Sequence, residues 1–299
     1  MLTHNKTPFL IANIIENNKI IDKIYYDDTK NKMKEVKLNQ CPYCLRQFGR
    51  NDLFKKHLVV CRTKLEYLLR LHEENPSHFR NFSIDRNNDA KLQLAFPLAT
   101  GERLVMLISG MNGCGKSYFI AQLLDNYLDV YKDRDIFLFS TQEFDDKLDV
   151  FRKITRVILD DSFLETELKL SDLRNSLCIF DDVDGIRNKK LYKAVDALKF
   201  DILKNGRDHA GDRKDDIDII VSNHTVLGGH ETKIMIHESF FYVLFPQGTT
   251  AHSIDTICRK YVGLNKEQTQ KVLKSDSRAV VIHKNYPRYV MTDKEIFLI

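Results

Sequence analysis

One eight-residue motif constrains this chain more than any other feature. Gly110-Met-Asn-Gly-Cys-Gly-Lys-Ser117 fits GxxxxGK[ST] at every fixed position. Glycines let the backbone N–H groups of such a loop turn inward around phosphates without side-chain collisions. Lys116 is expected to contact the β- and γ-phosphates of ATP, and the Ser117 hydroxyl to ligate Mg²⁺. The predicted nucleotide-binding residues are Gly110, Met111, Asn112, Gly113, Cys114, Gly115, Lys116 and Ser117.

The sequence around the motif has the pattern of an α/β domain over residues 92–299. An amphipathic helix is expected directly after the loop, because Phe119, Ile120, Leu123, Leu124, Tyr127 and Leu128 form one apolar stripe. Alternating helices and short apolar strands predict a mostly parallel sheet covered on both faces. The expected strands are Arg103–Ser109, Ile136–Ser140, Arg156–Leu159, Leu177–Asp181, Ile217–Ser222 and Phe240–Phe245, followed by a hairpin-like pair at the sheet edge, Ala279–His283 and Arg288–Thr292.

Two adjacent carboxylates end one of these strands, at Asp181 and Asp182. In P-loop enzymes the first such acid holds Mg²⁺, commonly through water, and a second can polarise the attacking water. We therefore assign Asp181 to the metal and Asp182 to water activation. Neighbouring strand residues point to opposite faces, so both acids can serve one site only if the chain turns after Asp181. In the alternative, Asp182 or Asp184 caps the next segment.

An amide and an arginine complete the predicted catalytic set. Asn223 ends the strand that starts at Ile217, where an amide can position the lytic water, although it is also a common turn residue. Its neighbour His224 is more often a turn residue than a base. Arg207 lies between the two polar strand ends in the sequence and is a candidate arginine finger for a neighbouring subunit, with Arg213 as its competitor.

A metal module precedes the α/β domain, within residues 37–75. Cys41, Cys44, His57 and Cys61 follow the spacing C-x₂-C-x₁₂-H-x₃-C, which predicts a tetrahedral Zn²⁺ site. Phe48 and Phe54 supply the bulk that the core of a ββα finger needs. A helix is expected to trail the finger. At this size the zinc is at minimum a folding staple.

The sequence leaves open whether the finger binds nucleic acid or protein. If it docks on DNA in the usual way, Arg50 and Lys56 face the groove, but one finger covers only about three base pairs. Residues 1–90 carry 16 basic and 11 acidic side chains, whereas residues 91–299 carry 30 and 31. This imbalance suggests an anionic polymer partner, with a solvated basic face as the alternative.

The remaining segments are less informative. Residues 1–36 are expected to form a hairpin or a helix, and residues 76–91 a polar linker. No apolar run is long enough to cross a bilayer, and no signal peptide is visible. Cysteines clustered with a histidine fit a reducing, intracellular compartment.

The order of these motifs resembles the FtsK–HerA-type genome-packaging ATPases of poxviruses, large nucleocytoplasmic DNA viruses and virophages. The resemblance covers roughly residues 92–299 and includes the closing segment Pro287–Asp293. It implies an additional-strand P-loop fold, in which the Asn223 strand lies between the P-loop strand and the Asp181 strand. It also implies a ring of subunits that pumps double-stranded DNA into a capsid, with capsid or portal-vertex proteins as partners, in the host cytoplasm or the virion.

The resemblance has limits. Asp182 stands where many relatives of this broad class carry Glu, Asn223 where Gln is frequent, and the zinc finger is not a general family feature. A helicase or AAA-type remodeller, and a zinc-finger DNA adaptor with a nucleotide switch, are the alternative functions. A small-molecule kinase would need an arginine-bearing lid, and the loop Thr225–Thr232 has no arginine. The 76 residues after Asn223 show no carboxylate cluster for a nuclease.

Overall fold

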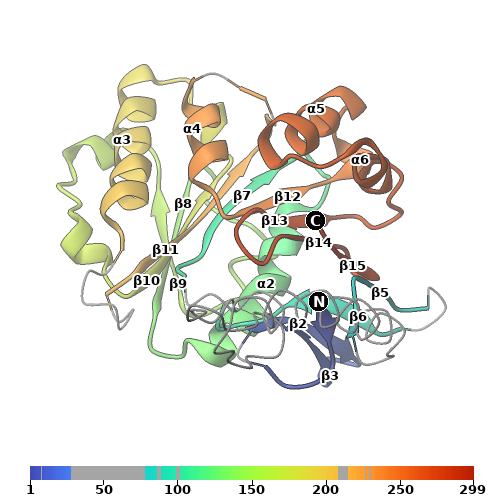
Figure 1. The fold of residues 1–299 in the computed structure, drawn as a ribbon. Helices are drawn as coiled ribbons and strands as arrows, with labels where there is room; N and C mark the ends of the chain where they lie inside the picture. Colours follow the sequence, from blue (N-terminus) through green and yellow to red (C-terminus); the bar gives the residue numbers. More distant parts are fainter. Residues whose placement is uncertain are drawn as a thin grey trace, which may run out of the picture.

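The computed structural model describes residues 1–7, 9–27, 78–85, 89–98, 102–207, 215–225, 227–228 and 230–299. These residues form two β-sheets, with helices on both faces of the larger one (Figure 1). The predicted α/β fold is therefore confirmed.

The larger sheet has ten strands within the described chain, in the order β5-β15-β14-β13-β12-β7-β11-β10-β8-β9. The strands from β12 to β9 run parallel to their neighbours, and the others pair antiparallel. The strands are β5 (Asn81–Ser83), β7 (Val105–Ser109), β8 (Asp135–Ser140), β9 (Ile154–Ile158), β10 (Ser176–Asp181), β11 (Ile217–Asn223), β12 (Phe241–Leu244), β13 (Val280–His283), β14 (Tyr289–Met291) and β15 (Glu295–Leu298).

Two expectations about strand order have different outcomes. Strand β11 lies between β7 and β10, as the family resemblance implied. The pair β13–β14 is an antiparallel hairpin as predicted, but it does not lie at the sheet edge, because β15 pairs outside β14 and β5 outside β15. Strand β5 comes from far upstream in the sequence, so local patterns could not indicate it.

Helices cover the large sheet on both faces. Helix α2 lies on the face shared with the smaller sheet, and α3, α4, α5 and α6 lie on the other (Figure 1). The helices are α2 (Lys116–Val130), α3 (Lys189–Asn205), α4 (His230–Glu238), α5 (Ala251–Thr256), the π-helical η5 (Ile257–Val262) and α6 (Lys266–Leu273); the 3₁₀ turns are η1 (Asp161–Glu165), η2 (Leu170–Leu173), η3 (Val183–Gly185) and η4 (Pro246–Gly248).

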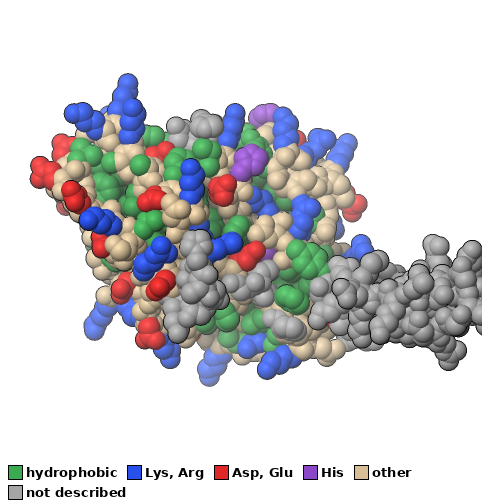
Figure 2. Space-filling view, turned by 60° about the vertical axis from the view of Figure 1, so that its left-hand side comes forward, with side chains coloured by type: hydrophobic (Ala, Val, Ile, Leu, Met, Phe, Trp, Pro, Cys, Tyr) green, Lys and Arg blue, Asp and Glu red, His purple; other side chains and the backbone are tan. Residues whose placement is uncertain are grey.

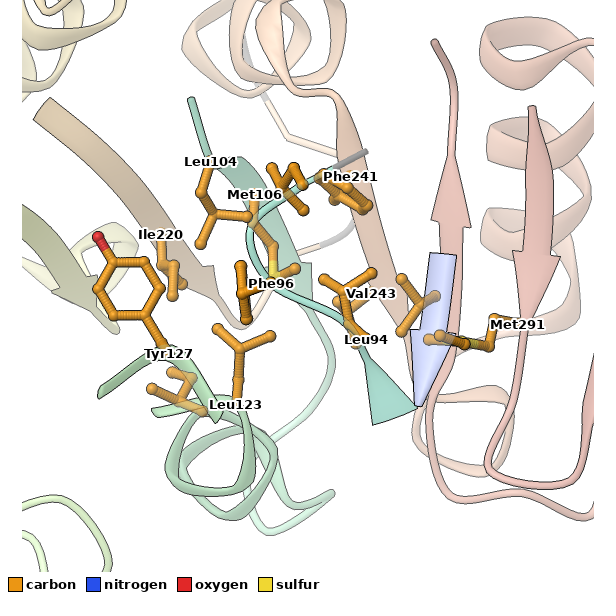
Figure 3. Packing of buried hydrophobic residues seen from close by; sticks show 14 of the residues in the cluster. Leu94, Phe96, Leu104, Met106, Leu123, Tyr127, Ile220, Phe241, Val243 and Met291 are labelled. Atoms are coloured by element: carbon orange, nitrogen blue, oxygen red, sulfur yellow. The ribbon is translucent and has the colours of Figure 1, made fainter. Parts of the chain in front are cut away.

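The alternation of side chains along β7 divides the core into two layers. Met106 and Ile108 join the cluster under α2 and the smaller sheet, while Val105 and Leu107 join the cluster under the other helices. Figure 3 shows the first layer, in which residues from β6, β7, α2, β12 and β14 converge. A strand buried on both faces explains why the sequence before the P-loop is continuously apolar.

The N-terminal residues form a hairpin that belongs to the smaller sheet. Its strands are β2 (Phe9–Glu16) and β3 (Lys19–Tyr26), and both turn residues, Asn17 and Asn18, have positive φ. Asparagine tolerates this conformation, which suits a two-residue hairpin turn. Of the two expected forms, hairpin or helix, the structure has the hairpin. The sheet order is β4-β1-β3-β2-β6, with β1 (Leu2–Thr3), β4 (His78–Phe79) and β6 (Lys91–Leu94).

The segment expected to be a linker, residues 76–91, contains strands. Strand β4 pairs with β1 in the smaller sheet, and β5 pairs with β15 in the larger one. A hydrogen bond holds the end of this segment in place: Nζ of Lys294 donates to the carbonyl of Ala90 at 2.7 Å. The described part of this segment therefore contributes a strand to each of the two sheets.

Charge is balanced over the surface of the α/β domain. Figure 2 shows basic and acidic side chains mixed over the face that it presents, in line with the 30 basic and 31 acidic residues of 91–299. In the part of the chain that the structure describes, no helix is both long and apolar enough to span a bilayer.

Candidate nucleotide-binding site

The predicted phosphate loop connects β7 to α2 and is held by backbone hydrogen bonds. The N–H of Gly110 donates to the carbonyl of Asn223 at 3.1 Å, and that of Met111 to the carbonyl of Gly248 at 3.1 Å. Gly115 has φ 109°, a conformation that side chains rarely adopt. Helix α2 starts at Lys116, so its positive end faces the inside of the loop, as anion binding requires.

Lys116 is buried and contacts three groups at the centre of the site. Its Nζ lies 3.2 Å from the carbonyl oxygen of Gly110, 3.2 Å from Oδ1 of Asp182 and 3.1 Å from Nδ1 of His224. The ammonium group thus bridges the loop and the ends of β10 and β11. A phosphate entering the loop would compete with Asp182 for this cation.

The parallel register brings the predicted polar residues to one edge of the sheet. Asp181 pairs with Ser222 across β10 and β11, and Asn223 pairs with Ser109 across β11 and β7. Ligands of open α/β sheets bind at this carboxyl edge. The structure therefore groups Lys116, Asp181 and Asn223, although they are far apart in sequence.

Asp181 has the properties of a cation ligand. Its side chain is buried, and Oδ1 accepts no hydrogen bond among the described residues. Burial, and secondarily the neighbouring Asp182, raises the pKa of Asp181 to about 6. A buried carboxylate without a compensating cation is unfavourable. The donor set of Asp181 and the Ser117 hydroxyl, with oxygen atoms only, suits Mg²⁺.

The chain turns directly after Asp181. Asp182 has φ 51°, in the left-handed region, and its N–H donates to the carbonyl of Ser222 at 3.0 Å. The turn η3 follows. This geometry meets the condition under which both carboxylates serve one site, because Asp182 leaves the strand alternation and reaches Lys116. Its side chain does not cap the turn.

Sequence reasoning treated two residues of this site, His224 and Asp184, as turn or capping residues. Nε2 of His224 lies 3.1 Å from Oδ2 of Asp182. Asp184 accepts hydrogen bonds from the backbone N–H of His224 and of Thr225, at 3.0 Å each, and from the Thr225 hydroxyl at 3.1 Å. The signal in the sequence was the position of His224 next to Asn223, but only the parallel pairing of β10 and β11 shows that these segments meet.

Asn223 is buried at the end of β11, and its Oδ1 accepts no hydrogen bond from the described residues. An unsatisfied buried amide is costly unless a water or ligand completes it. Because Asn223 pairs with Ser109 of β7, it lies at the same edge of the sheet as the phosphate loop. This is consistent with the water-positioning role predicted for it, which stays a prediction.

Arg207 lies at the opposite edge of the sheet. It follows α3, and the preceding Gly206 accepts a hydrogen bond from the N–H of Ile217 at 2.8 Å, at the start of β11. The buried Arg103 is its neighbour, since the charge of Arg207 contributes to lowering the Arg103 pKa, behind the dominant effect of burial. Arg207 therefore does not join Lys116 of the same chain, and only a role toward a neighbouring subunit remains open.

A different arginine lies against the phosphate loop. A Cβ added to Gly115 would come within 3.0 Å of Cδ of Arg278, and the Arg278 guanidinium lies 5.9 Å from the ring centre of Tyr118. Sequence reasoning did not single out Arg278, because it lies in a connection before β13 and matches no motif.

Cys114 fills the loop without signs of reactivity. Burial raises the pKa of its thiol, in spite of the nearby Lys116. Its side chain packs against the backbone of Gly248, where an added Cβ would come within 2.6 Å of Cys114 Cβ. Cys114 is therefore better explained as a small packing residue than as an oxidation-sensitive thiol. Cys178 and Cys258 are also free.

Several predicted residues lie outside the described residues. They are the zinc ligands Cys41, Cys44, His57 and Cys61, the candidate nucleic-acid contacts Arg50 and Lys56, and the alternative arginine finger Arg213.

Solved structures that are similar to this chain at low identity include two viral packaging enzymes and a secretion ATPase. The genome packaging NTPase B204 of Sulfolobus turreted icosahedral virus 2, in complex with AMPPCP, is 15% identical over 64% of this chain and 98% of that one, with a TM-score of 0.42. The DNA-packaging ATPase B204 of Sulfolobus turreted icosahedral virus is 17% identical, over 63% and 96%, at 0.44. The cytoplasmic domain of the type VII secretion ATPase EccC from Thermomonospora curvata is 12% identical, over 72% and 28%, at 0.45.

The relationship by sequence is closer to a virophage protein. No family model matches this chain. The uncharacterized protein V3 of Sputnik virophage is 31% identical over 190 residues, which span 63% of this chain and 74% of that protein. Identity at this level over most of the relative shows common descent, and the chain belongs to the same family as the Sputnik virophage protein V3.

Proposed function

We propose that this chain is an ATP-hydrolysing motor that translocates double-stranded viral DNA into a capsid. The observation that carries ATP hydrolysis in this proposal is the contact of Lys116, from the phosphate loop, with Asp182 at the end of β10, 3.2 Å apart. A loop that binds phosphates and a carboxylate that can act on water meet at one point. Binding alone would need the loop but not the acid.

The roles of the residues follow from their positions. Lys116 and the N–H groups of the loop gather the charge of the β- and γ-phosphates. Ser117 and Asp181 would hold Mg²⁺, which would supply further neutralisation of the phosphate charge. Because Asp181 is buried and its pKa is raised to about 6, a bound cation would favour the ionised carboxylate, which is the form that binds a metal.

Asp182 and Asn223 act on the attacking water. Asp182 orients it and accepts its proton, and the Asn223 amide holds it in line with the phosphate. When phosphates draw Lys116 away, Asp182 keeps His224 as a partner, at 3.1 Å. His224 therefore fixes the carboxylate while the cation changes partners.

The hypothesis that the chain is a DNA-translocating motor is supported by the order of motifs and by the virophage relative. The observed strand order β7-β11-β10 is the one that the resemblance to packaging ATPases implied. A homo-oligomeric ring would bring an arginine such as Arg207 to the nucleotide of a neighbour. Double-stranded DNA and capsid or portal-vertex proteins are the proposed partners, in the host cytoplasm or the virion.

Zn²⁺ is proposed as a second metal, bound by Cys41, Cys44, His57 and Cys61. The support is the ligand spacing in the sequence. Metal analysis of the purified full chain tests it: about one zinc per chain is expected, and loss of zinc from the Cys41→Ser variant would identify Cys41 as a ligand.

The decisive experiment is the steady-state rate of ATP hydrolysis with and without double-stranded DNA. We expect strong stimulation by DNA that weakens as salt rises, since phosphate contacts release counterions. Lys116→Ala should abolish turnover, and the exposed Lys19→Ala should not. Turnover that ignores DNA would contradict the motor and favour a remodelling enzyme. No turnover by the unmodified chain under any condition would contradict hydrolysis itself and favour the nucleotide switch.

A further inference from the structure

A cavity of about 330 Å³ opens beside the phosphate loop. One wall is the start of α2, with Gly115 and Tyr118, and the opposite wall is formed by Ala279 and Met291 of the β13–β14 region. Strand β6 of the smaller sheet closes it, through Leu92 and other residues. Its volume falls in the range of about 300–1,000 Å³ that is typical of small-ligand sites.

The lining combines apolar side chains with a few hydrogen-bonding groups. Phe119, Phe245 and Met291 supply apolar surface, and Gln93 and Gln122 supply amides. The Nε2 of Gln93 donates to the carbonyl of Gln122 at 2.7 Å, which ties β6 to α2. A flat heteroaromatic ring with polar edges suits such a lining better than a phosphate or an aliphatic chain does.

Arg278 stands between the cavity and the loop. It lines the cavity, lies against Gly115 and reaches over the ring of Tyr118, with the guanidinium 5.9 Å from the ring centre. A guanidinium and an aromatic ring at one mouth can take a purine between or beside them, because both stack on π-faces. Phosphates held at the start of α2 would leave the nucleoside of the same molecule next to this mouth.

We propose that the cavity binds the purine nucleoside of the nucleotide whose phosphates the loop holds, with Arg278 as a stacking residue. This rests on the proposed function, since it deepens the assignment of ATP as ligand. It also gives the N-terminal residues a part in nucleotide binding. Strand β6 pairs with β2 from Ala12↔Leu94 to Ile15↔Lys91, so the hairpin supports one wall of the cavity.

The test compares two probes, Mg²⁺-ATP and Mg²⁺-tripolyphosphate, in calorimetric titrations of the full chain. Tripolyphosphate reports on the loop alone, and ATP on the loop and the cavity. Ala279→Phe places bulk in the cavity and should weaken ATP binding about tenfold or more without changing tripolyphosphate binding. Thermal unfolding monitors whether this variant is folded.

Arg278→Ala is the second variant, because Arg278 is exposed and its removal should leave the fold intact. ATP affinity should fall about fivefold to tenfold, with tripolyphosphate unaffected. The matched control is Arg259→Ala, at an exposed ion pair with Asp255, which should change neither.

The outcomes separate the two proposals. Unchanged ATP affinity in folded Ala279→Phe would overturn the nucleoside site while leaving the phosphate loop intact. Equal losses for both probes in Arg278→Ala would put Arg278 on the phosphates and overturn its stacking role. If the unmodified chain binds neither probe, the proposed function itself fails.

Discussion

The ammonium group of Lys116 and the carboxylate of Asp182 lie 3.2 Å apart, and the imidazole of His224 contacts both, at 3.1 Å from each. The three side chains come from the phosphate loop, the end of β10 and the end of β11. In this arrangement the lysine is held by the acid that would later act on water. Nucleotide binding must therefore exchange one partner of Lys116 for another, and His224 remains on Asp182.

Replacement of His224 should lower turnover more than it lowers nucleotide affinity. His224→Ala leaves Asp182 without its second partner, and misplacement of the carboxylate should reduce kcat about tenfold to 100-fold. His224→Gln, which keeps a hydrogen-bond donor, should recover part of the rate. The exposed His252→Ala is the control. An increase in KM at constant kcat would contradict the positioning role and indicate a contact with ground-state phosphate.

Asp184→Ala should loosen the segment that carries His224. Asp184 accepts two backbone N–H groups and one hydroxyl from His224 and Thr225, so its loss leaves these donors to water. We expect a cost of about 1 kcal/mol in the free energy of unfolding, because the carboxylate is only half-buried, and a clear fall in kcat. Asp184→Asn keeps one acceptor and should lie between. Equal kcat values in the unmodified chain, Asp184→Ala and Asp184→Asn would show that the segment with His224 keeps its position without Asp184.

Asp181→Asn should stabilise the metal-free protein at pH 8 and abolish hydrolysis. Because the folded-state pKa of Asp181 is raised to about 6, the folded protein binds the proton more tightly than the unfolded chain does. Its ionisation therefore destabilises the fold as pH rises through the window from about 4 to about 6. We expect a gain of about 1–3 kcal/mol at pH 8 and almost none at pH 4.

Urea unfolding of the metal-free protein at both pH values measures this difference. A gain of the same size at pH 4 would contradict the electrostatic explanation. Mg²⁺ should reduce the gain, since it stabilises the ionised Asp181 of the unmodified chain but not the asparagine.

The buried pair of Arg134 and Asp218 should be essential to stability and irrelevant to chemistry. Asp218 accepts from Arg134 at 2.5 Å, from the Tyr127 hydroxyl at 2.6 Å and from the N–H of Leu104 at 2.6 Å. Arg134→Ala removes a charged partner of this buried carboxylate and should cost about 3–5 kcal/mol. Chemical denaturation measures it. Arg156→Ala, at a less buried pair with Asp149, should cost much less; equal costs would contradict the burial argument.

Much of the fold could be predicted because its signals are local. The phosphate loop, the helix from Lys116 and the strand ending at Asp181 each follow from glycine placement and apolar runs within a few residues. The N-terminal hairpin could not be distinguished from a helix, because the pairing of its strands with β1 and β6 decides the form and is not visible in the local sequence. The sequence predicts a linker where strands β4 and β5 lie, because a polar segment shows no sign of the distant partners β1 and β15.

The sequence by itself determined which chemistry is present: a loop shaped by glycines, a lysine at the start of a helix, and acids and an amide at strand ends. Local backbone sterics and residue type suffice for these. Only the tertiary structure decided which of these groups meet. Parallel pairing of β7, β11 and β10 joins Lys116, Asp182 and His224, while the return of α3 to the start of β11 carries Arg207 to the opposite edge. Such contacts depend on strand order, which is set by long-range burial and hydrogen bonding and not by neighbours in the chain.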